Sequence, residues 1–229
     1  MKSKVILTID GIRKDRLSIY NKKSNNISKN FERIAKESIV FNDMMACATS
    51  TAMCFASIFT GKYQKEFDRL YYGQNNNPFL ENIFTDHEKM GYKTYVCLNK
   101  RFIKFSNLIN SFGNADFWWT GNETTKENKN IGSLRPLEQV NYVIERINNL
   151  NYPTLIWVHL WGFSKPEDRF LVNTPFDYDA RVAELDEAVG VFFDKMNKNT
   201  ELFNRFTHLT YKTNMANKNF LNKVKQTML

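Results

Sequence analysis

The sequence predicts an α/β domain built on a mostly parallel sheet with helices on both faces. Short apolar runs rich in β-branched residues, such as 4–9 and 154–159, alternate with segments of helical periodicity. The run 154–159 is apolar almost throughout, which is typical of a central parallel strand. With 229 residues, of which 42% are hydrophobic, the chain is long enough to bury one sizeable core.

The first strand is expected at residues 4–9, and Asp10 and Gly11 follow it directly. Ligands in open α/β sheets bind outside the carboxyl ends of the strands. Asp10 is therefore a reasonable ligand for a hard metal ion, and the alternative is an Asx turn that only leads into the next helix. Residues 27–38 are expected to form an amphipathic helix, and 39–41 a short β-like run.

Residues 51–60 are predicted to form the next helix, which Gly61 ends. Hydroxyl-bearing residues lead this segment, and such residues are favoured at helix N-termini. Thr51 would then lie where free backbone N–H groups and the helix dipole favour an anion. The alternative is an ordinary capping threonine on a buried helix.

A helix and a strand are predicted at residues 79–90 and 92–98, separated by the glycine that closes the helix. His87 is expected on the surface of this helix. Lys100 follows the carboxyl end of the strand, where its ammonium group could contact an anion. An exposed lysine without such a role is the alternative.

The second half of the chain continues the alternation, with an aromatic strand or edge at 116–119 and a helix from Pro136 to Leu150. His159 then stands at the carboxyl end of the central strand 154–159. It is either a functional group or a satisfied core histidine. A last helix begins at Pro175, and we expect its carboxylates to be solvated.

The composition limits the partners and the location. The net charge of +8 suits anionic partners, although a solvated basic surface is the alternative. No nucleic-acid-binding motif is recognisable, so a basic nucleic-acid-binding domain is the weakest alternative and no nucleic acid is expected. The three cysteines have no CxxC spacing, and no apolar run approaches the roughly 18 residues of a transmembrane helix. With no room for a signal peptide, we expect a cytoplasmic location.

The segment from Thr51 to Tyr63, which contains Thr60 and Gly61, resembles the nucleophile segment of the sulfatase and alkaline phosphatase superfamily. In that family a Cys, Ser or Thr opens a helix that closes on a Thr-Gly pair, and Thr51 matches that position. The threonines in 49–51 also resemble those of the phosphoethanolamine-transferase branch. The nucleophile position holds Thr, and the Pro and Arg that accompany formylglycine formation are absent. The resemblance therefore implies direct attack by a threonine alkoxide.

Two further motifs resemble those of the family. Residues 9–17 resemble the motif whose first Asp binds metal, which implies that Asp10, with Thr51, holds a divalent cation (Ca, Mg, Mn or Zn). Residues 159–166 resemble a motif with two histidines, of which His159 matches the first and Ser164 replaces the second. The family implies hydrolysis or transfer at an anionic sulfate or phosphate ester, with Lys100 and His159 as substrate-binding groups.

The resemblance ends near Asn197. We therefore divide the chain into an incomplete sulfatase-like domain, residues 1–198, and a divergent basic tail, residues 199–229. The expected fold is a three-layer α/β/α structure, alkaline-phosphatase-like, that lacks its C-terminal part. In relatives, a further core strand ends in an Asp-His-Gly metal motif, but no Asp-His pair follows Met196 here. We accordingly expect an open sheet surface after Met196, and either a weak catalyst or an inactive remnant that only binds anions.

Overall fold

The computed structural model describes residues 3–24, 27–42, 44, 46, 51–63, 81–104, 106–120, 135–150, 153–160, 175–198 and 206–212. Five strands form one sheet in the order β3-β2-β4-β1-β5, and every pairing is parallel. The strands are β1 (Ser3–Ile9), β2 (Lys93–Asn99), β3 (Asp116–Thr120), β4 (Thr154–Leu160) and β5 (Phe206–Lys212). The predicted α/β class with a parallel sheet is confirmed.

Strand β4 lies between β1 and β2, and all of its residues are buried. The apolar run in the sequence predicted this central position, because a strand covered on both faces needs apolar side chains in both directions. Strand β3 is an edge strand, and its side chains are only partly buried. This too agrees with the aromatic strand or edge expected there.

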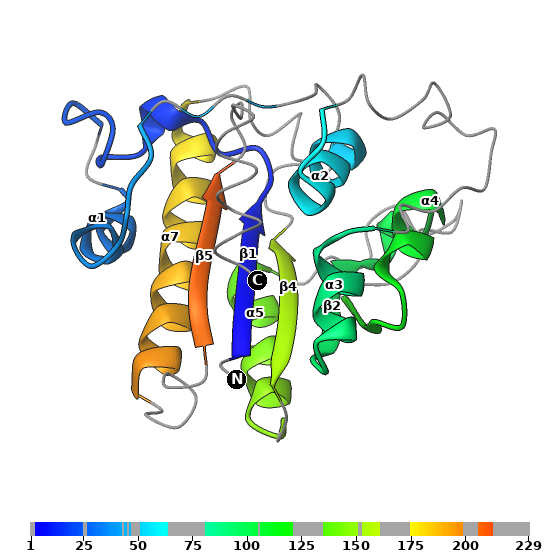
Figure 1. Cartoon of the computed structure of the whole chain (residues 1–229). Helices are drawn as coiled ribbons and strands as arrows, with labels where there is room; N and C mark the ends of the chain where they lie inside the picture. Colours follow the sequence, from blue (N-terminus) through cyan, green and yellow to red (C-terminus); the bar gives the residue numbers. More distant parts are fainter. Residues whose placement is uncertain are drawn as a thin grey trace, which may run out of the picture.

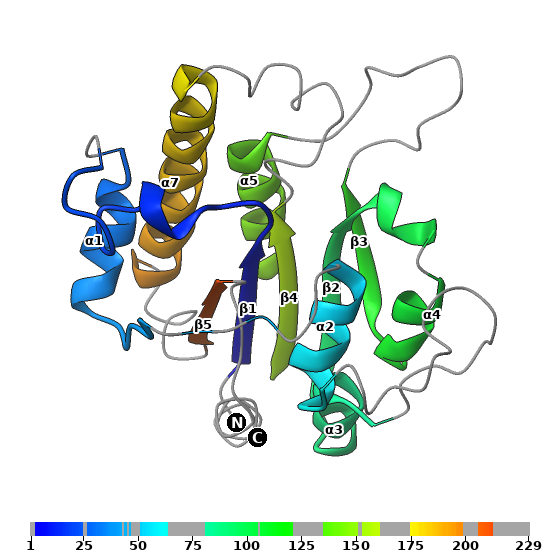
Figure 2. The ribbon, with the colours of Figure 1, turned by 90° about the horizontal axis from the view of Figure 1, so that it is seen from above.

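Helices cover both faces of the sheet (Figures 1 and 2). One layer contains α1 (Lys29–Lys36), α5 (Pro136–Ile147) and α7 (Pro175–Lys198). The other contains α2 (Thr51–Thr60), α3 (Ile83–Lys89), α4 (Ser106–Ile109) and the short 3-10 helices η4 (Lys100–Lys104) and η5 (Asn110–Phe112). A further 3-10 turn, η1 (Lys14–Arg16), follows β1. The predicted three-layer α/β/α architecture is confirmed.

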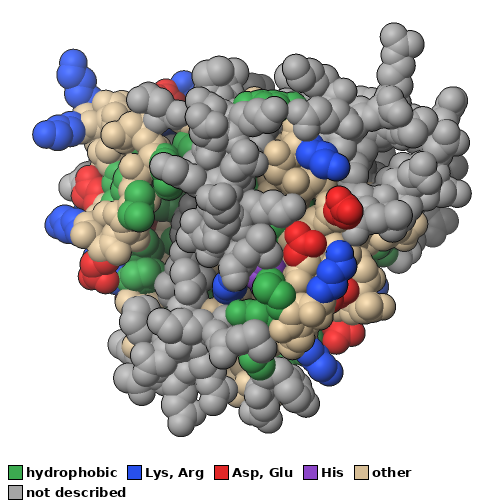
Figure 3. All heavy atoms as spheres, in the orientation of Figure 1, with side chains coloured by type: hydrophobic (Ala, Val, Ile, Leu, Met, Phe, Trp, Pro, Cys, Tyr) green, Lys and Arg blue, Asp and Glu red, His purple; other side chains and the backbone are tan. Residues whose placement is uncertain are grey.

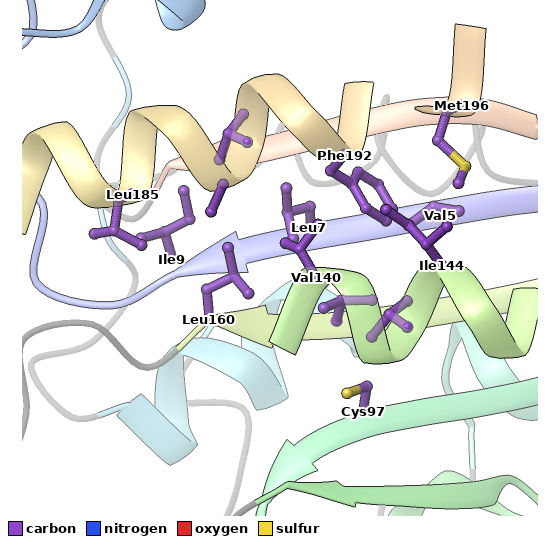
Figure 4. Packing of buried hydrophobic residues seen from close by; sticks show 14 of the residues in the cluster. Val5, Leu7, Ile9, Cys97, Val140, Ile144, Leu160, Leu185, Phe192 and Met196 are labelled. Carbon is purple, nitrogen blue, oxygen red and sulfur yellow. The ribbon is translucent and has the colours of Figure 1, made fainter. Parts of the chain in front are cut away.

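The alternation of side chains along β1 builds two cores. Val5, Leu7 and Ile9 pack with α5 and α7, where Val140 and Phe192 belong to the same cluster (Figure 4). The other face of the sheet carries an aromatic cluster, which contacts α2, α3 and the segment 102–112. Its ring-bearing members are Phe55, Phe59, Phe84, Phe102, Phe112 and Trp157.

The expectation of an open sheet after Met196 is wrong. Strand β5 pairs with β1 along its whole length, from Ser3 opposite Phe206 to Ile9 opposite Lys212. Figure 1 shows β5 beside β1 at the edge of the sheet. Its sequence, Phe-Thr-His-Leu-Thr-Tyr-Lys, mixes polar and apolar residues, so it lacks the continuous apolar pattern of the central strands.

Three other local expectations are corrected. Residues 39–41 form no strand and are exposed. His87 is fully buried, because its Nδ1 lies 2.6 Å from the Ile83 carbonyl and its Nε2 lies 3.2 Å from Lys4 Nζ. Asp186 on α7 is buried rather than solvated, since its carboxylate accepts hydrogen bonds from α1. Among the residues described, no helix is both long enough and apolar enough to cross a membrane.

Candidate functional site

Three of the residues predicted from the sequence lie at one edge of the sheet. Asp10 follows β1, Lys100 follows β2, and His159 is the penultimate residue of β4. Because these strands are parallel neighbours in the order β2-β4-β1, their carboxyl ends meet at the same edge. Two strand spacings separate the ends of β1 and β2, which is about 10 Å.

Helix α2 brings its first residue, Thr51, to this edge. Phe55 contacts the His159 ring at 4.9 Å between centroids, whereas Phe59, one turn later, contacts Phe84 at 5.0 Å. Phe55 also packs against Phe102, which lies just beyond the carboxyl end of β2. The helix therefore runs from the carboxyl edge back over the sheet. Thr51 precedes Phe55 by one turn, about 6 Å, and so lies further towards the edge.

The end of α2 is as the sequence predicted. Gly61 has a φ of 71°, a left-handed conformation that favours glycine, and its N–H donates to the Ser57 carbonyl at 2.9 Å. The Thr60 hydroxyl donates to the Ala56 carbonyl at 2.7 Å and accepts from the Lys62 N–H at 3.3 Å. The Thr-Gly pair thus satisfies the last carbonyl groups of the helix, which fixes its length and the position of its first turn.

The loop after Asp10 is held by α7. The Asp10 N–H donates to the Leu160 carbonyl at 3.2 Å, which extends the β1–β4 pairing by one residue. Gly11 follows with a φ of 77°, and its carbonyl accepts a hydrogen bond from the Tyr178 hydroxyl at 2.8 Å. The same hydroxyl accepts from the Arg13 N–H at 2.7 Å. Tyr178 therefore fixes the direction in which the chain leaves Asp10.

Ion pairs also hold this loop. The Arg13 guanidinium pairs with the Asp15 carboxylate at 2.6 Å and, through that hydrogen bond, lowers the pKa of Asp15. Arg16 pairs with Asp179 on α7 at 3.1 Å. The roles of Tyr178 and Asp179 have no local signal in the sequence, because an aromatic and an acidic residue at the start of a helix are common.

His159 is almost fully buried, with 1% of its surface exposed. Its Nδ1 lies 2.9 Å from the hydroxyl oxygen of Thr8, which also accepts a hydrogen bond from the Trp157 indole. The rings of Phe55 and Phe102 meet the imidazole edge to face. Burial lowers the pKa of His159 to about 3, so the ring is neutral at physiological pH. These contacts are those of a core histidine that joins β1, β4 and α2, and its substrate-binding role stays a prediction.

The residues at this edge do not by themselves make a site for a divalent cation. Asp10 offers a carboxylate and Thr51 a hydroxyl, whereas a hard cation takes about six oxygen ligands. Within the described part of the chain, no group of three or more His, Cys, Asp or Glu side chains is placed to hold a metal ion. Lys100 is also at this edge, and its ammonium group favours an anion over a cation. The metal-binding roles of Asp10 and Thr51 and the substrate-binding role of Lys100 stay predictions.

The fold and the edge residues define a three-layer α/β protein whose candidate site lies at the carboxyl ends of parallel strands. The family model for sulfatases matches residues 3–210, which is most of the chain, and so the chain belongs to the sulfatase family. The match extends into β5, beyond the point near Asn197 where the motifs of the sequence stop. A search of curated proteins found no match.

Several solved structures share the fold. The lipoteichoic acid synthase LtaP from Listeria monocytogenes is 14% identical, with a TM-score of 0.68, over 92% of this chain and 55% of its own. An alkaline phosphatase superfamily protein from Vibrio parahaemolyticus is 15% identical, with a TM-score of 0.68, over 92% of this chain and 54% of its own. The periplasmic domain of the phosphoethanolamine transferase EptC from Campylobacter jejuni is 14% identical, with a TM-score of 0.60, over 92% of this chain and 69% of its own. The alkaline-phosphatase-like fold is thus confirmed, and the chain spans little more than half the length of the first two structures.

Proposed function

We propose that this chain binds sulfate or phosphate monoesters at the carboxyl edge of its sheet and that the Thr51 oxygen attacks their sulfur or phosphorus atom at a low rate. The bond to the substrate alcohol breaks as the bond to Thr51 forms, the Thr51 proton leaves with the alcohol, and water then hydrolyses the ester on Thr51. The observation that supports this most is the direction of α2, whose contacts through Phe55 and Phe59 put its first turn at the edge where Asp10 lies. Membership of the sulfatase family supports ester chemistry as the general class.

The chemistry assigned to Thr51 needs help, because a free hydroxyl has a pKa far above neutral. The first turn of a helix supplies N–H groups without intrahelical partners and the positive end of the helix dipole. Both stabilise negative charge. They therefore favour the alkoxide of Thr51 over its neutral hydroxyl, and they attract the anionic oxygens of an ester. We propose that Lys100, which follows the end of β2 at the same edge, contributes a positive charge that stabilises an ester oxygen. His159 would pack against Phe55 and, in its predicted substrate-binding role, bind the ester.

The family resemblance assigns a divalent cation (Ca, Mg, Mn or Zn) to Asp10 and Thr51. These two oxygens are too few to hold it tightly, so we derive no catalytic step through a metal. We expect weak metal affinity and slow turnover, in line with the absence of an Asp-His pair after Met196 in the sequence. Residues outside the described part of the chain would have to supply any further ligands.

Turnover of p-nitrophenyl phosphate and p-nitrophenyl sulfate tests the proposal. We expect slow turnover that Thr51→Ala abolishes, that Thr51→Ser partly retains, and that Thr49→Ala only weakens. Each assay is run with added Mg²⁺, Mn²⁺, Ca²⁺ or Zn²⁺ and with a chelator, since these arms measure the metal dependence directly. Loss of activity in Thr49→Ala alone would move the nucleophile to Thr49, and full activity in Thr51→Ala would contradict the assignment.

A second candidate is a protein that binds the anion without turning it over. The small number of metal donors among the described edge residues favours it. Calorimetric titration with inorganic phosphate and sulfate separates the two. Binding that Lys100→Gln weakens, combined with no turnover under any metal condition, would support the non-catalytic function. Measurable turnover that depends on Thr51 would support the enzyme.

A further inference from the structure

Three consecutive apolar side chains are exposed after the end of α1. Ile39, Val40 and Phe41 expose 85%, 37% and 49% of their surfaces, and together they are called the apolar strip below. The other large hydrophobic side chains exposed in the described part of the chain, Met90 and Ile103, are isolated from one another. A contiguous exposed apolar segment marks an interaction surface more often than single exposed residues do.

The apolar strip is held in place by the loop that follows β1. The Tyr20 hydroxyl donates to the Phe41 carbonyl at 3.2 Å, and Lys14 Nζ donates to the carbonyl of the next residue, Asn42, at 2.6 Å. The first bond uses the backbone of the strip and the second that of the residue after it, and both leave the side chains of the strip exposed. The strip therefore lies against η1 and presents its side chains outward.

A basic cavity adjoins the apolar strip, because Lys14 and Tyr20, which hold the strip, also line the cavity. Its volume is about 590 Å³, it is shallow and widely open to solvent, and it is lined by Arg13, Lys14, Asp15, Tyr20 and Asn21. Arg13 and Lys14 carry two positive charges and Asp15 one negative charge, so the lining has a net charge of +1. The Lys14 ammonium lies 5.1 Å from the centroid of the Tyr20 ring. Figure 3 shows hydrophobic side chains on the flank where Figure 1 draws η1 and α1, with Lys and Arg as well as Asp and Glu side chains around them.

We infer that this surface docks on an anionic membrane, with the apolar strip in the interfacial region and a lipid phosphate in the basic cavity. Apolar side chains that enter the headgroup region and cations that attract anionic lipids act together in such binding. The strip is too small for the core of a stable protein interface, which needs about 800 Å² from each partner. An anionic bilayer needs only a shallow apolar contact, and it complements the charge of the cavity.

The proposed docking surface lies at the same end of the molecule as the candidate site. Figure 1 shows η1 at the end of the sheet where β1 finishes, and Arg13 is only three residues after Asp10. Docking would therefore turn the carboxyl edge towards the lipid headgroups. The inference does not rest on turnover by Thr51, because membrane binding is measured without any substrate.

Co-sedimentation with vesicles tests this inference on the full chain. We expect binding to vesicles of phosphatidylcholine mixed with phosphatidylglycerol, weaker binding to pure phosphatidylcholine, and a loss of binding as salt is raised. Phe41→Ser should reduce the partition coefficient about tenfold, because a half-exposed aromatic side chain is lost from the interface. Lys14→Gln should reduce it about fivefold. The matched controls, Met90→Ser at the opposite end of the sheet and Lys195→Gln, should bind as the unaltered chain does.

Circular dichroism of each variant shows whether it is folded, and all four substitutions are at exposed positions. No binding to anionic vesicles at low salt would overturn the inference. Equal binding to both kinds of vesicle, or equal losses in the control variants, would overturn it too. Sedimentation velocity gives a separate outcome, since self-association that Phe41→Ser abolishes would identify a second copy of the chain as the occupant instead.

Discussion

The carboxylate of Asp186 on α7 lies 2.8 Å from the backbone nitrogen of Phe31, in the first turn of α1. It also accepts from the Asn30 N–H at 3.0 Å and from the Asn30 side-chain amide at 3.1 Å. A side chain from another helix thus caps α1, whose own preceding residue, Ser28, makes no capping bond with its side chain. Burial raises the pKa of Asp186, and these three hydrogen bonds oppose that rise.

Asp186→Ala should lower the free energy of unfolding by about 1–3 kcal/mol. The change removes the partners of two backbone donors at the start of α1 and leaves them without a charged acceptor. Urea unfolding at pH 7 measures the loss. Glu187→Ala, at the adjacent exposed position, should change stability by less than about 0.5 kcal/mol. Similar values for the two variants would mean that the cap contributes nothing.

Gly190→Ala should destabilise the protein although alanine is the better helix former. A Cβ at this position would overlap Cγ of Asn30, so either the Asn30 side chain or the helices α1 and α7 would have to shift. The steric cost, about 1–3 kcal/mol, should exceed the roughly 1 kcal/mol gained in helix propensity. Combining Gly190→Ala with Asn30→Ala should recover part of the loss in urea unfolding. Additive losses would show that Asn30 is not the obstacle.

The order of elements could be predicted because local patterns decide it. The apolar run at 154–159 identified the central strand, and Gly61 identified the end of α2. Strand β5 was missed because an edge strand needs no continuous apolar face, and its pairing with β1 is set by contacts far away in the sequence. Such pairings leave no local signal.

The candidate site could be predicted only as far as strand ends and helix starts reveal it. Asp10 and Thr51 were found because each stands at the boundary of a strongly patterned element. The supporting residues were missed, since Tyr178 reaches the loop after Asp10 across 167 positions of sequence. The surface position predicted for His87 is wrong because its Lys4 partner lies 83 positions away in the sequence, where no local pattern reveals it. Contacts of this kind become visible only when the chain is folded.

The buried His159 should make stability fall in mild acid. Its pKa is about 3 in the folded chain and 6.5 ordinarily, so between these values the unfolded chain binds a proton that the folded chain does not. The free energy of unfolding is therefore unaffected above about pH 6.5 and decreases by about 1.4 kcal/mol for each pH unit below it. Urea unfolding at pH 7.5 and pH 5 should differ by about 2 kcal/mol from this group.

His159→Gln is the control for this pH dependence, because glutamine keeps a polar contact for Thr8 but does not titrate. The variant should be less stable at pH 7.5 and should lose less between pH 7.5 and pH 5 than the unaltered chain. If both proteins lose the same amount over that interval, another group causes the loss and the imidazole is not held neutral by burial.

Ending the chain at residue 205 should make it aggregate, whereas ending it at residue 212 should not. The first truncation removes β5 and leaves the backbone N–H and C=O groups of one side of β1 without partners. Strand β1 contains Val5, Ile6 and Leu7, so its open edge would offer both backbone pairing and apolar side chains to another molecule. The longer truncated chain retains the full pairing from Ser3 to Ile9. The soluble fraction after expression and light scattering at a matched protein concentration compare the two chains. Equal solubility would show that β5 does not protect the edge of the sheet.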